Sequence, residues 1–302
     1  MIYKPRTKPK ELTILELLNK RTELTSKDHK HYFSMKKGYE GEVKFDELLT
    51  DKMQCDCLIL NDLLLEVNNT TFQIDSLIIK QEKIFFYEVK NFEGDYYYEN
   101  GKLFKRPKYE ILNPLDQLNR SDSLLRQLLL SLGFKPQIDA SVVFINPEFT
   151  LYQAPLDKPI IYPTQLRNYI QSLNSNPSKL TIRHKKLADQ LTALHQTESP
   201  YTKIPAYDYD QLQKGITCLN CKSFSVKVNK RTCFCEKCGF KELVTNAVLR
   251  AIKEFQILFP DERITTNIIH DWCTVVDSKH PIRRILGANF KTLGSHQWTY
   301  YE

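Results

Sequence analysis

Residues 72–94, FQIDSLIIKQEKIFFYEVKNFEG, place two apolar segments on either side of a short polar turn. Segments of this length, rich in Ile, Phe and Val, predict an antiparallel hairpin of two strands. If the turn centres on Gln81-Glu82, Asp75 lies opposite Glu88. Side chains alternate along a strand, so Lys90 shares a face with Glu88. The hairpin therefore predicts two carboxylates and an ammonium group close together.

The same alternation gives the hairpin two apolar faces, which is typical of central strands. It predicts Leu77 and Ile79 on the face of the charges, and Ile74 and Ile78 on the other. Carboxylates beside such surfaces are costly unless they are paired or bind a cation. Mg²⁺ suits this setting because it prefers oxygen ligands and keeps bound water. A buried salt-bridge cluster of the same charges is the alternative that the spacing leaves open.

Phosphodiester hydrolysis gives these residues definite roles. Asp75 and Glu88 would hold Mg²⁺ or Mn²⁺, with the Val89 carbonyl as a further ligand. The metal would polarise the scissile phosphate and lower the pKa of a bound water. Lys90 would position this nucleophile and stabilise the developing charge.

Four motifs follow one another in a characteristic order. They are Gly38-Tyr39-Glu40-Gly41-Glu42, Gln73-Ile74-Asp75, Glu88-Val89-Lys90-Asn91 with Gly94, and Asn113-Pro114-Leu115-Asp116-Gln117. Together they resemble the NERD (nuclease-related domain) proteins of the PD-(D/E)XK nuclease superfamily, over roughly residues 35–150. The resemblance implies DNA cleavage with a divalent cation, and an α/β fold with a PD-(D/E)XK restriction-endonuclease-like core, a mixed sheet flanked by helices.

Two helical residues extend the predicted catalytic group. Glu42 falls on the same helical stripe as Phe45 and Leu49, so its carboxylate needs a partner. We expect it to contact the metal or its waters, or to orient Lys90. The alternative is a carboxylate favoured by the dipole at a helix N-terminus. For Gln117, the resemblance implies contact with substrate or a metal-bound water, and a solvent-facing glutamine is the alternative.

Two C-x-x-C pairs, Cys218 with Cys221 and Cys235 with Cys238, are separated by thirteen residues. This spacing is typical of a zinc ribbon, in which four thiolates bind one Zn²⁺ in a closed tetrahedral site. Such a zinc stabilises the fold and leaves no position for substrate. Cys233 could replace Cys235 as a zinc ligand only if the geometry of the site were altered. The clustering in a long chain argues against a disulfide scaffold.

A chain of 302 residues exceeds what one core usually organises. Residues 196–213 lack periodicity and contain two prolines, which is typical of a linker. The expected segments are an N-terminal helical extension (1–36), a NERD nuclease domain (37–195), the linker (196–213), a zinc ribbon (214–242) and a helical C-terminal module (243–302). This last module is either of helix-turn-helix or winged-helix type, or a helical cap on the ribbon.

The net charge of +7 is concentrated near the C-terminal end, where residues 214–302 hold 14 Lys and Arg against 8 Asp and Glu. A basic segment is expected of a protein that contacts phosphate backbones, although solvated basic surfaces are also common. The candidate nucleic-acid contacts are Lys105, Arg106, Arg120, Lys227, Lys230, Arg231, Arg283 and Arg284.

The first residues lack an apolar signal region, and no window holds eighteen consecutive apolar residues, so we expect a cytoplasmic protein with no membrane partner. The predicted function is a divalent-metal-dependent nuclease that hydrolyses DNA, with a zinc-stabilised basic region that binds nucleic acid. Defence against foreign DNA and DNA processing or repair are candidate roles. The alternative is a catalytically inactive nucleic-acid-binding or scaffold protein. RNA as substrate, a homo-oligomer and a protein partner stay open.

Overall fold

The computed structural model describes residues 1–81, 83–198 and 200–302. They form two compact units. The first unit contains Met1–Pro9 and Phe33–Thr202, and the second contains Lys10–Tyr32 and Lys203–Glu302. Among the described residues, no helix combines the length and apolar character that a membrane span requires.

The first unit is built on a mixed six-stranded sheet with the order β1-β2-β3-β4-β8-β10. The three strands β2, β3 and β4 are antiparallel neighbours, whereas β1 runs parallel to β2, and β8 runs parallel to β4 and β10. The strands are β1 (Ile2–Lys4), β2 (Leu58–Val67), β3 (Thr70–Ile79), β4 (Lys83–Lys90), β8 (Gln137–Phe144) and β10 (Ile160–Ile161).

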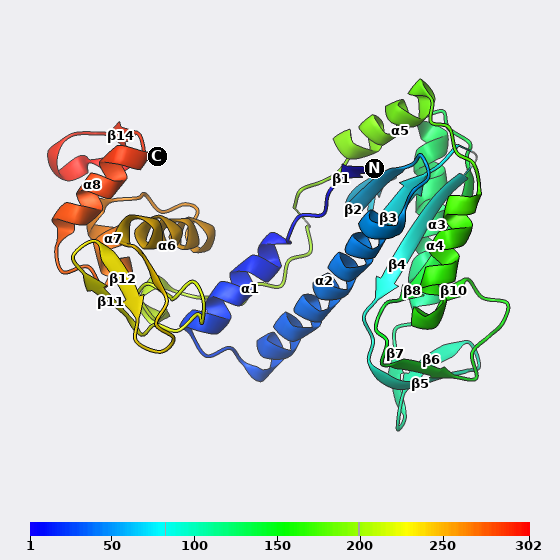
Figure 1. The fold of residues 1–302 in the computed structure, drawn as a ribbon, viewed down its shortest axis with the longest axis horizontal. Coiled ribbons are helices and arrows are strands. Elements are labelled where there is room, and N and C mark those ends of the chain that lie inside the picture. Colours follow the sequence, from blue (N-terminus) through cyan, green and yellow to red (C-terminus); the bar gives the residue numbers. More distant parts are fainter. Residues whose placement is uncertain (82, 199) are drawn as a thin grey trace. The chain divides into compact units, whose positions relative to one another are not determined.

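Helices cover both faces of this sheet (Figure 1). On one face, α2 (Ser26–Lys52) and α4 (Leu166–Ser175) pack through residues such as Phe45 and Ile170. On the other, α3 (Pro114–Ser131) and α5 (Ile182–Ala193) contribute residues such as Leu118 and Leu191. A mixed sheet flanked by helices confirms the predicted α/β fold class.

A smaller four-stranded sheet follows the order β7-β6-β5-β9. Its strands are β5 (Gly94–Glu99), β6 (Lys102–Lys105), β7 (Tyr109–Ile111) and β9 (Phe149–Tyr152). The stretch between β10 and α4 contains the short 3-10 helix η1 (Pro163–Gln165).

The register of the β3–β4 hairpin is the predicted one, since Ser76 pairs with Tyr87 and Ile79 with Ile84. Of the predicted turn residues, Glu82 lies outside the described part of the chain. The placement of Ile74 was wrong, because Ile74 packs in the same core as Leu77. Alternation is interrupted next to Asp75.

The interruption has a backbone cause in the neighbouring strand. Asp62 adopts a left-handed conformation with φ 55° between the Asn61–Ser76 and Leu63–Ile74 pairs. Leu60 and Leu63 consequently face the same core although they are three residues apart. Asp75 therefore lies at the position where the side-chain alternation of β2 and β3 switches from one face of the sheet to the other.

In the second unit, four helices and a three-stranded sheet share one core. Arg21 lies within it, paired with Glu254 at 2.6 Å and 4.1 Å above the ring of Trp272. The helices are α1 (Lys10–Arg21), α6 (Val244–Leu258), α7 (Thr266–Cys273) and α8 (Lys279–Asn289). The strands are β11 (Val226–Asn229), β12 (Thr232–Cys235) and β13 (Lys241–Leu243), with a separate hairpin of β14 (Thr292–Leu293) and β15 (Tyr300–Tyr301).

These units divide the chain differently from the predicted segments. The stretch expected as one N-terminal extension contributes β1 to the sheet of the first unit, whereas Leu18 of α1 is buried in the second. The predicted linker is also divided, because Leu212 is buried in the core of the second unit. Gln196 instead donates its backbone N–H to Leu64 in the first unit.

Candidate active site

Asp75, Glu88 and Lys90 meet between the central strands β3 and β4. The carboxylate of Asp75 accepts a hydrogen bond from the backbone N–H of Val89, with 2.7 Å between Oδ2 and N. Lys90 Nζ lies 2.6 Å from Glu88 Oε1 in an ion pair. Asp75 is 7% exposed and Glu88 is 9% exposed. The structure thus brings together the three residues that the hairpin pattern singles out.

The two carboxylates of this cluster can carry more negative charge than the single ammonium group of Lys90 neutralises. Burial raises the pKa of Asp75. Burial, followed by the negative charge of Asp75, raises the pKa of Glu88 to about 7. Burial alone would lower the pKa of Lys90, but the carboxylates of Glu88 and Asp75 outweigh it and the pKa is raised. A further cation beside the two carboxylates would relieve their repulsion.

Glu42 reaches the same region from α2. Burial, and then the charge of Asp75, raises the pKa of Glu42 to about 8. Gly41 accounts for this close approach, because a Cβ atom at Gly41 would lie only 2.4 Å from Asn91 Cβ. The motif residues Gly41 and Asn91 therefore allow the helix to pack directly against the end of β4.

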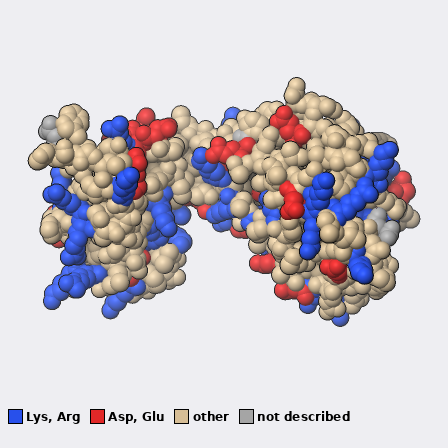
Figure 2. Space-filling model, turned by 90° about the horizontal axis from the view of Figure 1, so that it is seen from above, with Lys and Arg blue, Asp and Glu red and all other residues tan. Residues whose placement is uncertain are grey.

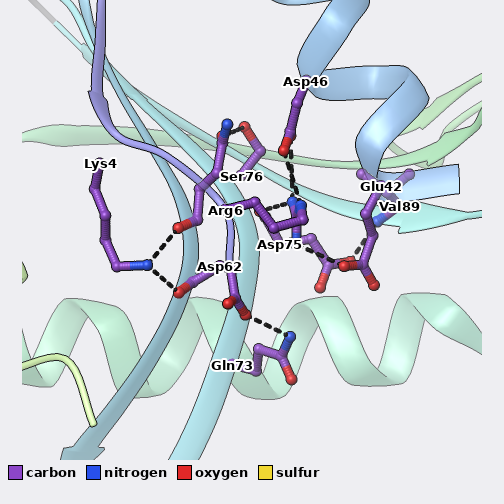
Figure 3. A network of polar contacts seen from close by, with 10 residues as sticks. Lys4, Arg6, Glu42, Asp46, Asp62, Gln73, Asp75, Ser76 and Val89 are labelled. Carbon is purple, nitrogen blue, oxygen red and sulfur yellow. Dashed lines mark hydrogen bonds and ion pairs between the residues drawn. The ribbon is translucent and has the colours of Figure 1, made fainter. Parts of the chain in front are cut away.

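Arg6 is the principal residue that the sequence patterns missed. Its guanidinium lies 2.5 Å from Glu42 Oε2 and 2.8 Å from Asp46 Oδ2, and it donates to the backbone carbonyl of Asp75 at 2.6 Å (Figure 3). The Arg6 side chain is 4% exposed. Nothing in the basic N-terminal sequence distinguishes Arg6 from its neighbours. Asp46 offered a signal, since it lies one helical turn after Glu42.

A second set of contacts fixes the backbone around Asp62. Lys4 Nζ donates to the carbonyls of Asn61 and Asp62, each at 2.8 Å. The Gln73 amide donates to the Asp62 carboxylate at 3.3 Å, as Figure 3 shows. Ser76 donates to the Asn61 side chain at 2.9 Å. These bonds hold the strand irregularity next to Asp75.

Gln117 is half-buried on α3, and its amide makes no hydrogen bond to any residue that the structure describes. Its motif has a clear role in starting the helix. Asn113 caps α3 by accepting from the Leu115 N–H at 3.1 Å, and Pro114 follows at the first helical position. Helix initiation therefore accounts for part of this motif.

The carboxylates fit a hard divalent cation. Asp75 Oδ1 and Glu88 Oε2 accept no hydrogen bond from the described residues, whereas their partner oxygens are occupied. Glu42, Asp75 and Glu88 do not converge as tightly as the cysteines described below. Mg²⁺ needs no such cage, because it commonly binds one or two carboxylates and completes its shell with water and phosphate oxygens.

The second unit contains a four-thiolate cluster. The sulfur atoms of Cys218, Cys221, Cys235 and Cys238 all lie within 4.8 Å of one another. The Cys218–Cys238 and Cys221–Cys235 sulfur distances are 3.6 Å and 3.5 Å. A tetrahedral site with Zn–S bonds of about 2.3 Å requires sulfur separations of about 3.8 Å. The cluster is therefore compatible with a zinc ribbon.

Cys233 lies outside this cluster although it belongs to the same strand as Cys235. It is 1% exposed and pairs with Val228 across the ladder. Burial raises the pKa of its thiol to about 11. Cys233 and Cys235 are two residues apart in a strand, so alternation alone would place both thiols on the same face. Only Cys235 belongs to a C-x-x-C pair, with Cys238.

The candidate nucleic-acid contacts of the first unit are exposed. Lys105 lies 5.6 Å from the ring centroid of Tyr96, and the Arg106 guanidinium lies 5.7 Å from that of Tyr152. Arg120 is exposed on α3.

Those of the second unit fall into two groups. Lys227, Lys230 and Arg231 belong to the β11–β12 hairpin, where Lys227 pairs with Glu236 at 2.6 Å. Lys230 and Arg231 line an open cavity of about 770 Å³. Arg283 and Arg284 are exposed on α8. Figure 2 shows Lys and Arg side chains on the visible surface of this unit, with fewer Asp and Glu among them.

Comparison with known proteins identifies one part of the chain. Residues 37–145 match the model of the NERD family, described as nuclease-related domain. The searches of curated proteins and of solved structures each returned no match. The matched segment includes Glu42, Asp75, Glu88 and Lys90. The chain therefore carries a NERD, or nuclease-related, domain at residues 37–145.

Proposed function

We propose that the first unit is a divalent-metal-dependent nuclease that hydrolyses DNA phosphodiester bonds. One observation carries the proposal: Asp75 and Glu88 share a buried cluster whose negative charge exceeds the single ammonium of Lys90. Such a cluster is costly in the absence of a cation. The nuclease-related family match supports the same reading.

In this proposal the carboxylates of Asp75 and Glu88, together with the Val89 carbonyl, would hold Mg²⁺ or Mn²⁺. The bound ion supplies Lewis acidity and a water of lowered pKa. The Val89 N–H fixes the Asp75 carboxylate, so its second oxygen keeps one direction. Lys90 carries its proton, because its pKa is raised, and acts as a donor to the attacking water and the phosphate.

The helical residues position these groups. Glu42 accepts hydrogen bonds from waters beside Asp75, and Gln117 contacts the DNA strand. Arg6 is a positioning residue, since its guanidinium joins the Glu42 carboxylate to the backbone of Asp75. Its positive charge also offsets the repulsion between Glu42 and Asp75.

The second unit would bind nucleic acid through its basic surface and owe part of its stability to Zn²⁺. Four thiolates complete the coordination of zinc, so this metal has a structural role. We propose DNA as the partner, with RNA as the alternative, in defence against foreign DNA or in DNA processing.

A catalytically silent nucleic-acid-binding protein is the second candidate, and the Lys90–Glu88 ion pair favours it, because a structural salt bridge has the same geometry. Purified protein incubated with linear, circular and single-stranded DNA, with Mg²⁺, Mn²⁺ or no divalent ion, separates the two. Metal-dependent products support the nuclease. Intact DNA under every condition, together with measurable DNA binding, supports the silent protein.

A further inference from the structure

The C-terminal part of the second unit has a specific order of elements. Helix α6 is followed by Ile264, which forms an isolated antiparallel bridge to Tyr301. Helices α7 and α8 come next, and the chain then forms the β14–β15 hairpin that contains Tyr301. This succession of helix, short strand, two helices and hairpin is that of a winged helix, in which the last helix contacts DNA.

One side of α8 packs and the other is open. Ile282, Ile285 and Leu286 are buried in the core of the second unit. On the opposite side of the helix, exposed residues follow one another at spacings of three and four. They are Lys279, His280, Arg283, Arg284, Gly287 and Ala288.

This exposed side has the size and chemistry of a reader of duplex DNA. A helix of eleven residues is about 16 Å long, and the major groove admits an α-helix. Gly287 and Ala288 are small, and a Cβ atom added at Gly287 would meet nothing within 4 Å. The helix backbone can therefore approach a surface closely one turn after the two arginines.

The charges on this side are free to bind a polyanion. Residues 278–301 contain four Lys and Arg and no Asp or Glu. Within the described part of the chain, neither Arg283 nor Arg284 forms an ion pair or hydrogen bond through its side chain. Arginine can bond guanine edges in a bidentate manner or contact phosphates.

The loop of the hairpin, residues 294–299, adds a second contact. Its turn depends on Gly294 at φ 73°, where a Cβ atom would lie 2.3 Å from the Trp298 carbonyl oxygen. The Trp298 side chain is 74% exposed, which is unusual for so large an apolar group. This exposed indole, in the loop that follows the basic helix α8, offers an N–H donor for a DNA phosphate.

We propose that α8 and the loop 294–299 bind double-stranded DNA, with α8 in the major groove and the loop against the adjoining backbone. This inference rests on the proposed nuclease function by naming duplex DNA as its substrate class. The binding surface itself lies outside the NERD segment. Shape favours the duplex, because a single strand offers no groove for a helix.

Fluorescence anisotropy of the full chain tests the surface. The probes are a labelled duplex of about 20 base pairs, roughly two helical turns, and the single strand of the same sequence. No divalent ion is added, and gels confirm that the DNA stays intact. Arg283→Ala and Arg284→Ala are compared with Lys253→Ala, which removes one charge from an exposed position on α6.

We expect each arginine variant to bind the duplex about tenfold more weakly, the loss of one good contact, while Lys253→Ala binds like the wild type. Gly287→Glu should weaken duplex binding at least as much, because it places a negative charge on the binding surface. Gly287→Ala should not weaken it. Neither side chain should disturb the fold, since a Cβ atom at Gly287 would meet nothing within 4 Å. Circular dichroism checks that each variant is folded.

Equal duplex binding by the wild type, Gly287→Glu and both arginine variants would overturn the inference. So would an equal loss of single-strand and duplex binding, which would indicate a general electrostatic surface. Binding of an acidic protein without any binding of duplex DNA would also overturn the inference. Because binding is measured without cleavage, a chain that binds as expected but never cuts would refute the proposed nuclease function and leave this inference standing.

Discussion

Asp75 Oδ2 lies 2.7 Å from the backbone nitrogen of Val89, so a carboxylate of β3 is fixed between the positions of Glu88 and Lys90 on β4. A charge-assisted hydrogen bond to a backbone N–H is stronger than a neutral one and helps to hold the Asp75 carboxylate in place. The other oxygen of Asp75 then has a fixed direction. The predictions for the first unit depend on this arrangement.

After burial, the charge of Asp75 should contribute most to the raised pKa of Glu88. In protein without divalent ions, Glu88 should titrate near its raised pKa of about 7. Asp75→Asn keeps an oxygen that can accept from Val89 but removes the charge, so the pKa of Glu88 should fall. Carbon-13 NMR of the glutamate carboxyl groups measures both midpoints. An unchanged Glu88 midpoint in the variant would contradict the assigned cause.

Stability of the first unit should fall as the pH rises. The folded pKa values of Glu88 and Glu42, about 7 and about 8, exceed the ordinary value of 4.5. The folded state therefore binds more protons, and the stabilisation, full below about pH 4.5, is lost as the pH rises through 7 to 8. Glu88→Gln should lose less stability between pH 6 and 8.5 than the wild type.

Urea unfolding without divalent ions measures this difference. Circular dichroism follows both units, while tryptophan fluorescence reports the second unit alone, because both tryptophans, Trp272 and Trp298, belong to it. Parallel pH profiles of the wild type and Glu88→Gln in the first unit would contradict the prediction.

Removal of Arg6 should destabilise the first unit. Arg6→Gln leaves Glu42 and Asp46 without their buried partner, and such losses cost about 3–5 kcal/mol when the remaining charge cannot escape. Glu42 and Asp46 retain 19% and 14% side-chain exposure, so we expect a loss nearer about 2 kcal/mol. Lys44→Gln, at an exposed position of α2, is the control and should change stability by less than about 0.5 kcal/mol. Equal urea midpoints for the two variants would refute the role of Arg6.

The zinc site should depend on Cys235 and not on Cys233. The wild type and Cys233→Ala should each bind about one Zn²⁺ per chain, because Cys233 lies outside the cluster. Cys235→Ala leaves three thiolates and should lose most of its zinc. Elemental analysis after gel filtration measures the ratio. Retention of zinc by Cys235→Ala together with its loss from Cys233→Ala would mean that the ligands are assigned wrongly.

The sequence predicted the hairpin register because period-two alternation and a short turn determine which residues face one another, as the Ser76–Tyr87 pair demonstrates. It also predicted the four cysteines, whose spacing is characteristic. Arg6 escaped prediction because it reaches Glu42 through a contact 36 residues away in sequence. The prediction for Ile74 was wrong because the backbone of Asp62 is left-handed, and no residue pattern indicates that conformation.

The unit boundaries escaped prediction for a similar reason. Strand β1 is only three residues long, Ile2–Lys4, and it joins the sheet through pairing with β2 rather than through a distinctive sequence. The sequence pattern therefore predicted a single extension for a segment that contains both β1 and the start of α1.

The rate of DNA cleavage under single-turnover conditions tests the central claim most directly. Wild type, Asp75→Asn and Lys90→Met are each mixed in excess with duplex DNA and Mg²⁺ or Mn²⁺, after circular dichroism shows that all are folded. We predict metal-dependent cleavage by the wild type and a loss of at least about 100-fold in both variants, as expected for removal of a group that stabilises the transition state. Cleavage at wild-type rates by either variant would contradict the assignment of the active site to Asp75, Glu88 and Lys90.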